Sequence, residues 1–130
     1  MNIVGNTPIV EYDNLYFKLE YKNPTGSIKD RAAYNILTNY LKQNIINKGD
    51  TVVISTSGNI GISIAYFGKI LGLNVIVTMP SNMSKERIEL MEKYDAKVIL
   101  TEGLYVLNEE IRDVMDVKVY VFTPLELPHT

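Results

Sequence analysis

The spacing of apolar residues along the chain switches repeatedly between a strand pattern and a helix pattern. The β-branched runs at residues 51–55 (TVVIS) and 74–78 (NVIVT) are typical of strands that are buried on both faces. Residues 15–21 (LYFKLEY) instead alternate apolar and polar side chains, which predicts a strand with one buried face. Two more strands are predicted at residues 97–101 and 117–122.

Apolar residues at helical spacing separate these strands. They predict helices at about residues 27–46, 57–71, 84–94 and 104–115. Short strands that alternate with amphipathic helices pair in parallel through right-handed crossovers. The sequence therefore predicts the α/β class, with a small, mostly parallel open sheet flanked by helices. A length of 130 residues gives one domain, residues 1–130, around one core.

The composition restricts the possible chemistry. Thirteen Lys and Arg residues against fifteen Asp and Glu residues give a net charge of -2, which argues against binding to nucleic acid or to an anionic membrane. There is no cysteine, and the only histidine is His129. A thiolate nucleophile and a multi-histidine metal site are thus excluded within one chain, and no metal site is expected. Any catalysis would use lysine, carboxylates, hydroxyl groups or a cofactor.

The sequence offers no sign of export or of a membrane span. Residues 1–10 lack the basic start and apolar run of a signal peptide. The longest apolar stretch, residues 60–79, contains glycines and polar residues that suit a helix, a turn and a strand better than a span. We expect a soluble, cytoplasmic protein.

One candidate site follows the strand at 51–55. Thr56, Ser57, Gly58 and Asn59 open the next predicted helix, where unpaired N–H groups and the helix dipole favour an anion. Two hydroxyl groups and an amide add hydrogen-bonding side chains, so the loop could hold a carboxylate or a phosphate. The same residue types also cap helices that bind nothing. The pattern alone leaves both interpretations open.

The second candidate is Lys29, in the first turn of the helix predicted at 27–46. The helix dipole opposes a cation there, which favours the uncharged amine and hence a nucleophile toward an aldehyde. A single lysine is more often a solvated charge, and the spacing alone does not decide between the two roles.

Other side chains are interpreted as structural. Met79, Met83, Met91 and Met115 are expected to fill the core. The charged residues of 85–93 are expected to form the exposed face of one helix, with Glu89 and Lys93 as a favourable pair four residues apart.

Four segments together resemble a known family. They are GNTPIV from residue 5, KLEYKNPTGSIKDRAA from residue 18, GDTVVISTSGNIGISIAYFGKILG from residue 49 and TMPSNMSKERIELMEKYDAKVILTEG from residue 78. In this order, and nearly without gaps from residue 5 to 103, they resemble the cysteine synthase family. These are fold-type II pyridoxal phosphate enzymes, and they include O-acetylserine sulfhydrylase and cystathionine β-synthase.

The resemblance implies a role for each matching residue. Lys29 matches the catalytic lysine that bonds to the cofactor aldehyde and later moves the α-proton of the amino-acid substrate. Asn59 matches the residue beside the phenolic oxygen of the cofactor. Thr56, Ser57 and Gly58, with Asn59, match the loop that closes on the substrate carboxylate. The implied activity is β-replacement, of the O-acetylserine sulfhydrylase type, in cysteine biosynthesis.

The chain departs from the family pattern in three places. Ile60 stands where the family usually has a threonine, and it cannot donate a hydrogen bond to a carboxylate. Asp95 replaces a usual glycine in the turn before a strand, which aspartate tolerates. Leu125 and Glu126 fall near a family glutamine that contacts the substrate.

Length is the largest departure. Family chains are more than twice as long, and the part without a counterpart supplies the glycine-rich loop around the cofactor phosphate. The chain corresponds to the N-terminal segment plus the small domain, with the large C-terminal half absent. We therefore expect weak or absent binding of pyridoxal phosphate and negligible activity from this chain alone. Uncovered apolar surface predicts a homo-oligomer, or docking on a complementary or full-length synthase chain.

Three hypotheses follow. In the first, the chain is part of an enzyme and works with a complementary chain. In the second, it is a degenerate, non-catalytic interaction protein that binds a full-length synthase or another partner, which Ile60 and Glu126 favour. A nucleotide-binding module that uses residues 57–61 ranks last, because it leaves Lys29 unexplained.

Overall fold

The computed structural model describes residues 3–101 and 117–118. The predicted helix at 104–115 and most of the predicted strand at 117–122 lie outside the described residues. Met115, Leu125, Glu126 and His129 lie outside them too.

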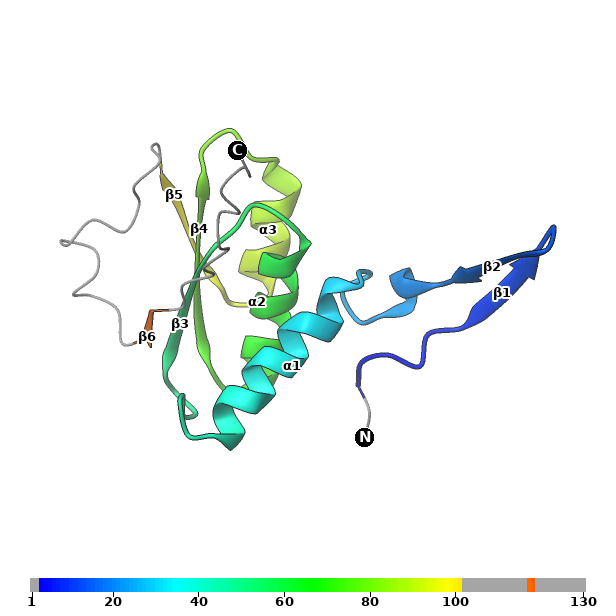
Figure 1. Cartoon of the computed structure of the whole chain (residues 1–130). Helices are drawn as coiled ribbons and strands as arrows, with labels where there is room; N and C mark the ends of the chain where they lie inside the picture. The colour runs from blue at the N-terminus through cyan, green and yellow to red at the C-terminus, as the bar shows by residue number, and fades with distance from the viewer. Residues whose placement is uncertain (1–2, 102–116, 119–130) are drawn as a thin grey trace, which may run out of the picture.

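A parallel sheet forms the centre of the fold (Figure 1). Its strands are β3 (Thr51–Ser55), β4 (Asn74–Pro80), β5 (Lys97–Thr101) and β6 (Val117–Lys118), in the order β5-β4-β3-β6. Every neighbouring pair is parallel. Val52, Val53 and Ile54 of β3 are all buried, as the β-branched run predicts. The predicted α/β class with a small parallel sheet is confirmed.

Three helices lie to one side of the sheet in Figure 1: α1 (Lys29–Lys42), α2 (Asn59–Leu71) and α3 (Lys85–Lys93). α2 packs against the sheet and α1 packs against α2. The ring of Tyr34 on α1 lies 5.3 Å from that of Phe67 on α2. No helix within the described residues is long and apolar enough to cross a membrane.

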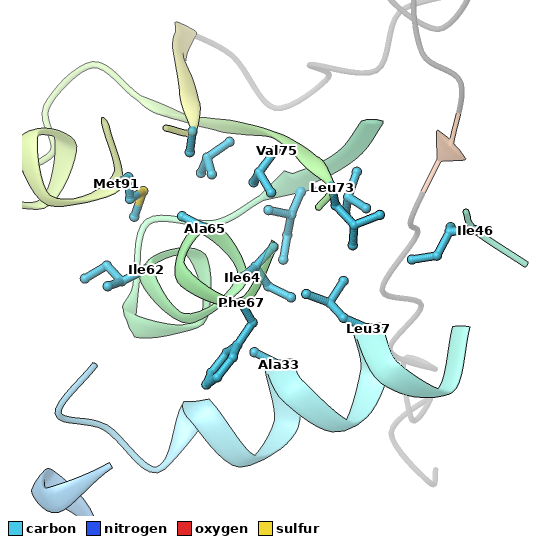
Figure 2. Close-up of a cluster of buried hydrophobic side chains, with 14 of the residues drawn as sticks. Ala33, Leu37, Ile46, Ile62, Ile64, Ala65, Phe67, Leu73, Val75 and Met91 are labelled. Carbon is cyan, nitrogen blue, oxygen red and sulfur yellow. The ribbon is translucent and has the colours of Figure 1, made fainter. Parts of the chain in front are cut away.

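The core lies on both faces of α2, between α2 and the sheet and between α2 and α1 (Figure 2). Phe67 of α2 is fully buried on the side that faces α1, and Ala65 of α2 and Val77 of β4 are fully buried in the same cluster. Gly68 brings the helix close to the sheet, because a Cβ atom at Gly68 would lie 2.3 Å from Cγ2 of Val75. Helix α2, which begins at Asn59, is therefore packed closely on β4.

An antiparallel hairpin that the sequence did not fully predict projects from this body (Figure 1). β1 (Ile9–Tyr12) pairs with β2 (Leu15–Lys18). The turn between them places Asp13 and Asn14 at positive φ, 50° and 59°, as two-residue hairpin turns require.

The prediction of a strand with one buried face at 15–21 is wrong in two respects. The strand ends at Lys18 and a 3₁₀ turn, Glu20–Lys22, follows it, and every residue of both strands is exposed. Alternation marks an apolar face but cannot show what covers it, and no other described element packs on this hairpin. The register places four apolar side chains on that one exposed face: Val10, Tyr12, Leu15 and Phe17.

Candidate functional site

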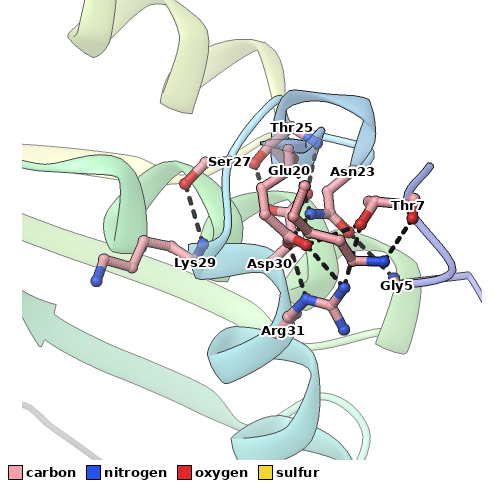
Figure 3. A network of polar contacts seen from close by, with 10 residues as sticks. Gly5, Thr7, Glu20, Asn23, Thr25, Ser27, Lys29, Asp30 and Arg31 are labelled. Atoms are coloured by element: carbon pink, nitrogen blue, oxygen red, sulfur yellow. Dashed lines mark hydrogen bonds and ion pairs between the residues drawn. The ribbon is translucent and has the colours of Figure 1, made fainter. Parts of the chain in front are cut away.

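Lys29 is the first residue of α1. Its backbone N–H donates a 3.0 Å hydrogen bond to Oγ of Ser27, while the residue at the N-cap, Ile28, makes no side-chain cap. The side chain of Lys29 is exposed and extends away from the neighbouring polar network (Figure 3). The predicted first-turn position of this lysine is confirmed.

The next residue, Asp30, is fully buried. Its Oδ2 accepts a 2.7 Å hydrogen bond from the backbone N–H of Thr25, and its Oδ1 accepts one from the hydroxyl of Thr25. The hydroxyl of Ser63, on α2, donates a 2.6 Å hydrogen bond to the same Oδ1. We call Thr25, Asp30 and Ser63 the Asp30 cluster.

The loop at residues 56–58 follows the carboxyl end of β3. The N–H of Thr56 donates to the carbonyl of Thr78 at 3.0 Å, and the N–H of Gly58 donates to Oγ1 of Thr56 at 3.3 Å. These residues, with Ser57 between them, are half-buried, and Asn59 begins α2 with its side chain exposed. The predicted junction of strand, loop and helix is present.

The starts of α1 and α2 are joined through Ser63. Its Oγ lies 2.6 Å from the carboxylate of Asp30 and 3.0 Å from the carbonyl oxygen of Asn59. Within the described residues, no hydrogen bond or ion pair joins Lys29 itself to residues 56–59. The structure thus brings the two helix starts together and leaves the amine of Lys29 open to solvent.

The two departures inside the described region have structural explanations. Ile60 is half-buried and lines an apolar pocket of about 70 Å³ between α1, α2 and β3. Its side chain therefore serves packing. Asp95 has a φ of 63°, so it occupies the left-handed conformation that glycine usually supplies. The remaining residues that line the pocket are Ile36, Leu37, Tyr40, Val52, Ile54 and Ile64.

Several residues of this region were not predicted from the sequence. The sequence predicts only an exposed charged face for α3, yet Nη1 of Arg87 donates a 3.1 Å hydrogen bond to the carbonyl of Ser57. The ion pair that forms on this helix is Lys85–Glu89 at 3.6 Å, and the predicted pair of Glu89 with Lys93 is not formed. A long charged side chain on a helix can pair with either of two partners at similar spacing, so the sequence pattern does not determine which ion pair forms. Met79 and Met91 are buried as predicted.

A polar network fastens the base of the hairpin to α1 (Figure 3). Arg31 donates from Nε and Nη2 to the two carboxylate oxygens of Glu20 at 2.8 and 2.9 Å. The hydroxyl of Thr7 donates to Glu20 at 2.8 Å, and the side-chain amide of Asn23 does so at 2.7 Å. The hydrogen bonds from Arg31, then those from Thr7 and Asn23, lower the pKa of Glu20 from 4.5 to about 2, against the opposing effect of its desolvation.

These groups suit a particular kind of ligand. An exposed amine can bond to an aldehyde, and the amide of Asn59 can donate to an oxygen anion. The hydroxyls and N–H groups at the start of α2 suit a carboxylate. These groups are compatible with an aldehyde at Lys29 and with a carboxylate at the start of α2.

Comparison with known proteins identifies the family. Residues 1–128 match the family model described as pyridoxal-phosphate dependent enzyme. The chain is 38% identical over 124 residues to a cysteine synthase of Staphylococcus aureus, which covers 89% of this chain and 40% of that protein. It is 39% identical over 110 residues to a probable cysteine synthase of Bacillus subtilis, covering 78% of this chain and 35% of that protein.

Solved structures agree with the sequence relatives. A hydrogen sulfide-producing enzyme from Fusobacterium nucleatum superposes with a TM-score of 0.78 at 36% identity, over 87% of this chain and 40% of that one. A cysteine synthase from Entamoeba histolytica gives a TM-score of 0.75 at 36% identity, over 87% and 37%. This chain spans about 40% of the length of the first of these curated relatives. The chain belongs to the family of pyridoxal-phosphate dependent enzymes and, within it, resembles the cysteine synthases.

Proposed function

We propose that this chain supplies the lysine-bearing part of a pyridoxal phosphate site of the cysteine synthase type. The reaction would be β-replacement on an activated amino acid such as O-acetylserine, in which sulfide displaces acetate and cysteine forms. Lys29 is the proposed catalytic residue, and the observation that carries the proposal is its exposed amine at the start of α1, beside the start of α2. We expect the protein to act in the cytoplasm.

The residues present fit the cofactor. Lys29 offers a primary amine for the aldehyde, and Asn59 offers an amide donor at the first residue of α2. When bound, pyridoxal phosphate supplies a ring that accepts the electrons left when a proton leaves the substrate α-carbon. Lys29 would hold the cofactor and move that proton, while Asn59 would orient the ring by donating to its oxygen.

Thr56, Ser57 and Gly58 would bind the substrate carboxylate. The hydroxyls and the N–H groups at the start of α2 are donors, and the dipole of α2 favours an anion there. The side chain of Ile60 lines the apolar pocket and contributes no donor because it is a hydrocarbon. We therefore expect the carboxylate to rely more on backbone N–H groups than it would with a threonine at that position.

We propose that residues 1–130 form an N-terminal segment plus small domain, and that the remainder of the site comes from further polypeptide. The curated relative from Staphylococcus aureus is more than twice as long, since the match covers 89% of this chain and 40% of that protein. Contacts to the cofactor phosphate are proposed to lie in that remainder. A cofactor without its phosphate contacts is poorly oriented, and a misplacement of about 1 Å can reduce the rate about a hundredfold. Negligible activity of the 130-residue chain alone is expected.

The hairpin supports a protein partner. Its apolar face exposes 75% of Tyr12 and 60% of Leu15, and it projects from the body (Figure 1). Apolar side chains gathered on an exposed face are typical of a protein–protein contact. We propose that this face packs against a complementary or full-length synthase chain, or against a second copy.

The alternative function is a non-catalytic interaction protein that binds a full-length synthase. Ile60 in place of the usual family threonine favours it, as does the exposed hairpin. Intact Lys29 and Asn59 favour the enzymatic role.

Cofactor binding can be tested on the full chain. Pyridoxal phosphate is titrated into the protein while visible absorbance is recorded, and the product is reduced with borohydride and mapped by mass spectrometry. Because this chain alone is expected to bind the cofactor weakly, we expect a weak saturable band with the label at Lys29, and no such band in Lys29→Ala. Lys42, at the other end of α1, gives the matched control variant Lys42→Ala, which should keep the band. Labelling spread evenly over the lysines would contradict the proposed role.

The two functions are separated by complementation. The chain is mixed with a polypeptide that carries the remaining part of the Staphylococcus aureus cysteine synthase, and sulfide-dependent formation of cysteine is measured. Turnover that needs Lys29 supports the enzymatic role. The interaction role is supported if the chain binds a full-length synthase stably but gives no turnover when mixed with the remaining part.

A further inference from the structure

The Asp30 cluster places a carboxylate where carboxylates are rarely found. Asp30 is fully buried, as is the hydroxyl-bearing residue Ser63. A buried carboxylate is costly unless donors surround it. Three donors do so here, namely the N–H and hydroxyl of Thr25 and the hydroxyl of Ser63.

These hydrogen bonds hold the first turn of α1 in place, from the loop before the helix and from α2. Asp30 is the second residue of the helix and is covalently next to Lys29. The bonds from Thr25 close the loop that leads into the helix, and Oγ of Ser27 accepts the N–H of Lys29. Ile28 makes no side-chain cap. These polar side chains therefore stabilise the first turn of the helix instead of a capping side chain.

Ser63 extends the contact to the other helix start. It lies one turn after Asn59, and its Oγ is 3.0 Å from the Asn59 carbonyl oxygen. The hydroxyls of Thr25 and Ser63 are 3.2 Å apart, so the cluster is continuous from the loop before Lys29 to the first turn of α2. The backbone positions of Lys29 and Asn59 are thereby fixed relative to each other.

We infer that Ser63 and Asp30 are positioning residues. They hold the helix turn that carries Lys29 at a fixed position relative to the turn that carries Asn59, so that one aldehyde cofactor can contact both side chains. This inference rests on the proposed function, because it assigns Lys29 and Asn59 to a single ligand. Both residues would act through the backbone of the residues beside them, and neither would need to touch the ligand.

The experiment measures selective labelling. The full chain is incubated with pyridoxal phosphate and reduced with borohydride, and the ratio of label at Lys29 to label at Lys42 is obtained by peptide mapping. Both lysines are exposed and lie at opposite ends of α1, so Lys42 is an internal reference. We expect the ratio to fall about tenfold in Ser63→Ala, within the range that small misplacements produce.

A matched control removes a different helix hydroxyl. Thr38→Ala deletes a hydroxyl on α1 that donates only within its own helix, to the carbonyls of Tyr34 and Asn35. Its labelling ratio should equal that of the unmodified chain. All ratios are taken below the melting temperature of each variant, where circular dichroism shows it folded, so a loss of stability alone does not change them.

A second variant and a ligand-free measurement complete the test. Asp30→Asn keeps the shape of the side chain and should lower the ratio in the same way, even if Ser63→Ala fails to fold. In the absence of cofactor, amide hydrogen exchange at Thr25 and Lys29, whose N–H groups are hydrogen-bonded to Asp30 and Ser27, should accelerate in Asp30→Asn and not in Thr38→Ala.

The outcomes separate the positioning role from the proposed function. An unmodified chain that labels Lys29 selectively, with unchanged ratios in folded Ser63→Ala and Asp30→Asn, overturns the positioning role and leaves the proposed function standing. An unmodified chain that labels Lys29 and Lys42 equally overturns both.

Discussion

Arg31 and Glu20 form a two-pronged ion pair in which Nε lies 2.8 Å from Oε2 and Nη2 lies 2.9 Å from Oε1. The pair joins the first turn of α1 to the base of the hairpin. Paired hydrogen bonds of this geometry hold both side chains in fixed orientations.

The pair predicts a pH dependence of stability. The folded-state pKa of Glu20, about 2, lies below its ordinary value of 4.5, so the stabilisation is complete above about pH 4.5 and is lost as the pH falls toward 2. At pH 6 we expect the free energy of unfolding of the unmodified chain to be larger than that of Glu20→Gln. This difference should shrink as the pH falls from about 4.5 toward 2. Urea denaturation at a series of pH values measures it. Glu11→Gln, on the exposed strand β1, is the control, and a difference that does not change with pH would contradict the assignment.

Gly5 is predicted to be intolerant of a side chain. Its φ is 88°, and an added Cβ atom would lie 2.9 Å from Nη1 of Arg31. Because that guanidinium is held by Glu20, it cannot move away freely. We expect Gly5→Ala to lower the free energy of unfolding by about 1–3 kcal/mol, the usual cost of a strained backbone. Thermal and urea denaturation give the value, and an unchanged melting temperature would refute the prediction.

Replacement by alanine should affect stability differently at Gly68, inside α2, and at Gly58, the N-cap of α2. In a helix interior, alanine is favoured over glycine by about 1 kcal/mol. At Gly68 the added Cβ would meet Val75 at 2.3 Å, and overpacking costs about 1–3 kcal/mol, so we expect net destabilisation. Gly58 has no atom within 4 Å of its Cβ position and a φ of -112°, so Gly58→Ala should be neutral. Equal melting temperatures for the two variants would show that α2 approaches β4 less closely than described.

The hairpin face is predicted to affect association and not stability. Val10 and Phe17 are paired across the two strands and are 43% and 45% exposed. Replacing both with threonine should change the free energy of unfolding by less than about 0.5 kcal/mol, as at other surface sites. Sedimentation velocity should show weaker self-association or weaker binding to a synthase chain. Tyr16→Thr, on the opposite face, is the control, and equal effects of the two changes would exclude the face as the contact.

Much of the fold could be predicted from the sequence because the signals were local. Strand β3 at Thr51–Ser55 and strand β5 at Lys97–Thr101 were predicted at their observed bounds. A β-branched run and a turn glycine determine the backbone conformation of the residues next to them, so the local pattern and the structure agree. β1 was missed because a four-residue strand beside Pro8 carries little periodic signal.

The site could be predicted only in part. Lys29 and Asn59 stand at helix starts that residue type and spacing indicate. The partnership of Asp30 with Ser63 joins residues 33 positions apart, and nothing local marks it. The same holds for Arg87 and Ser57, 30 positions apart. Side-chain contacts between elements depend on how the elements pack, which no single-sequence pattern encodes.

The polar character of the hairpin's attachment has a thermodynamic consequence. β1 and β2 bury none of their residues, and the contacts at their base are largely hydrogen bonds and an ion pair. Release of this arm from the body would expose little new apolar area, so it would carry a small heat-capacity increment and a shallow dependence on urea concentration. Calorimetry would then register a broad, weak event ahead of the cooperative melting of the sheet and its helices.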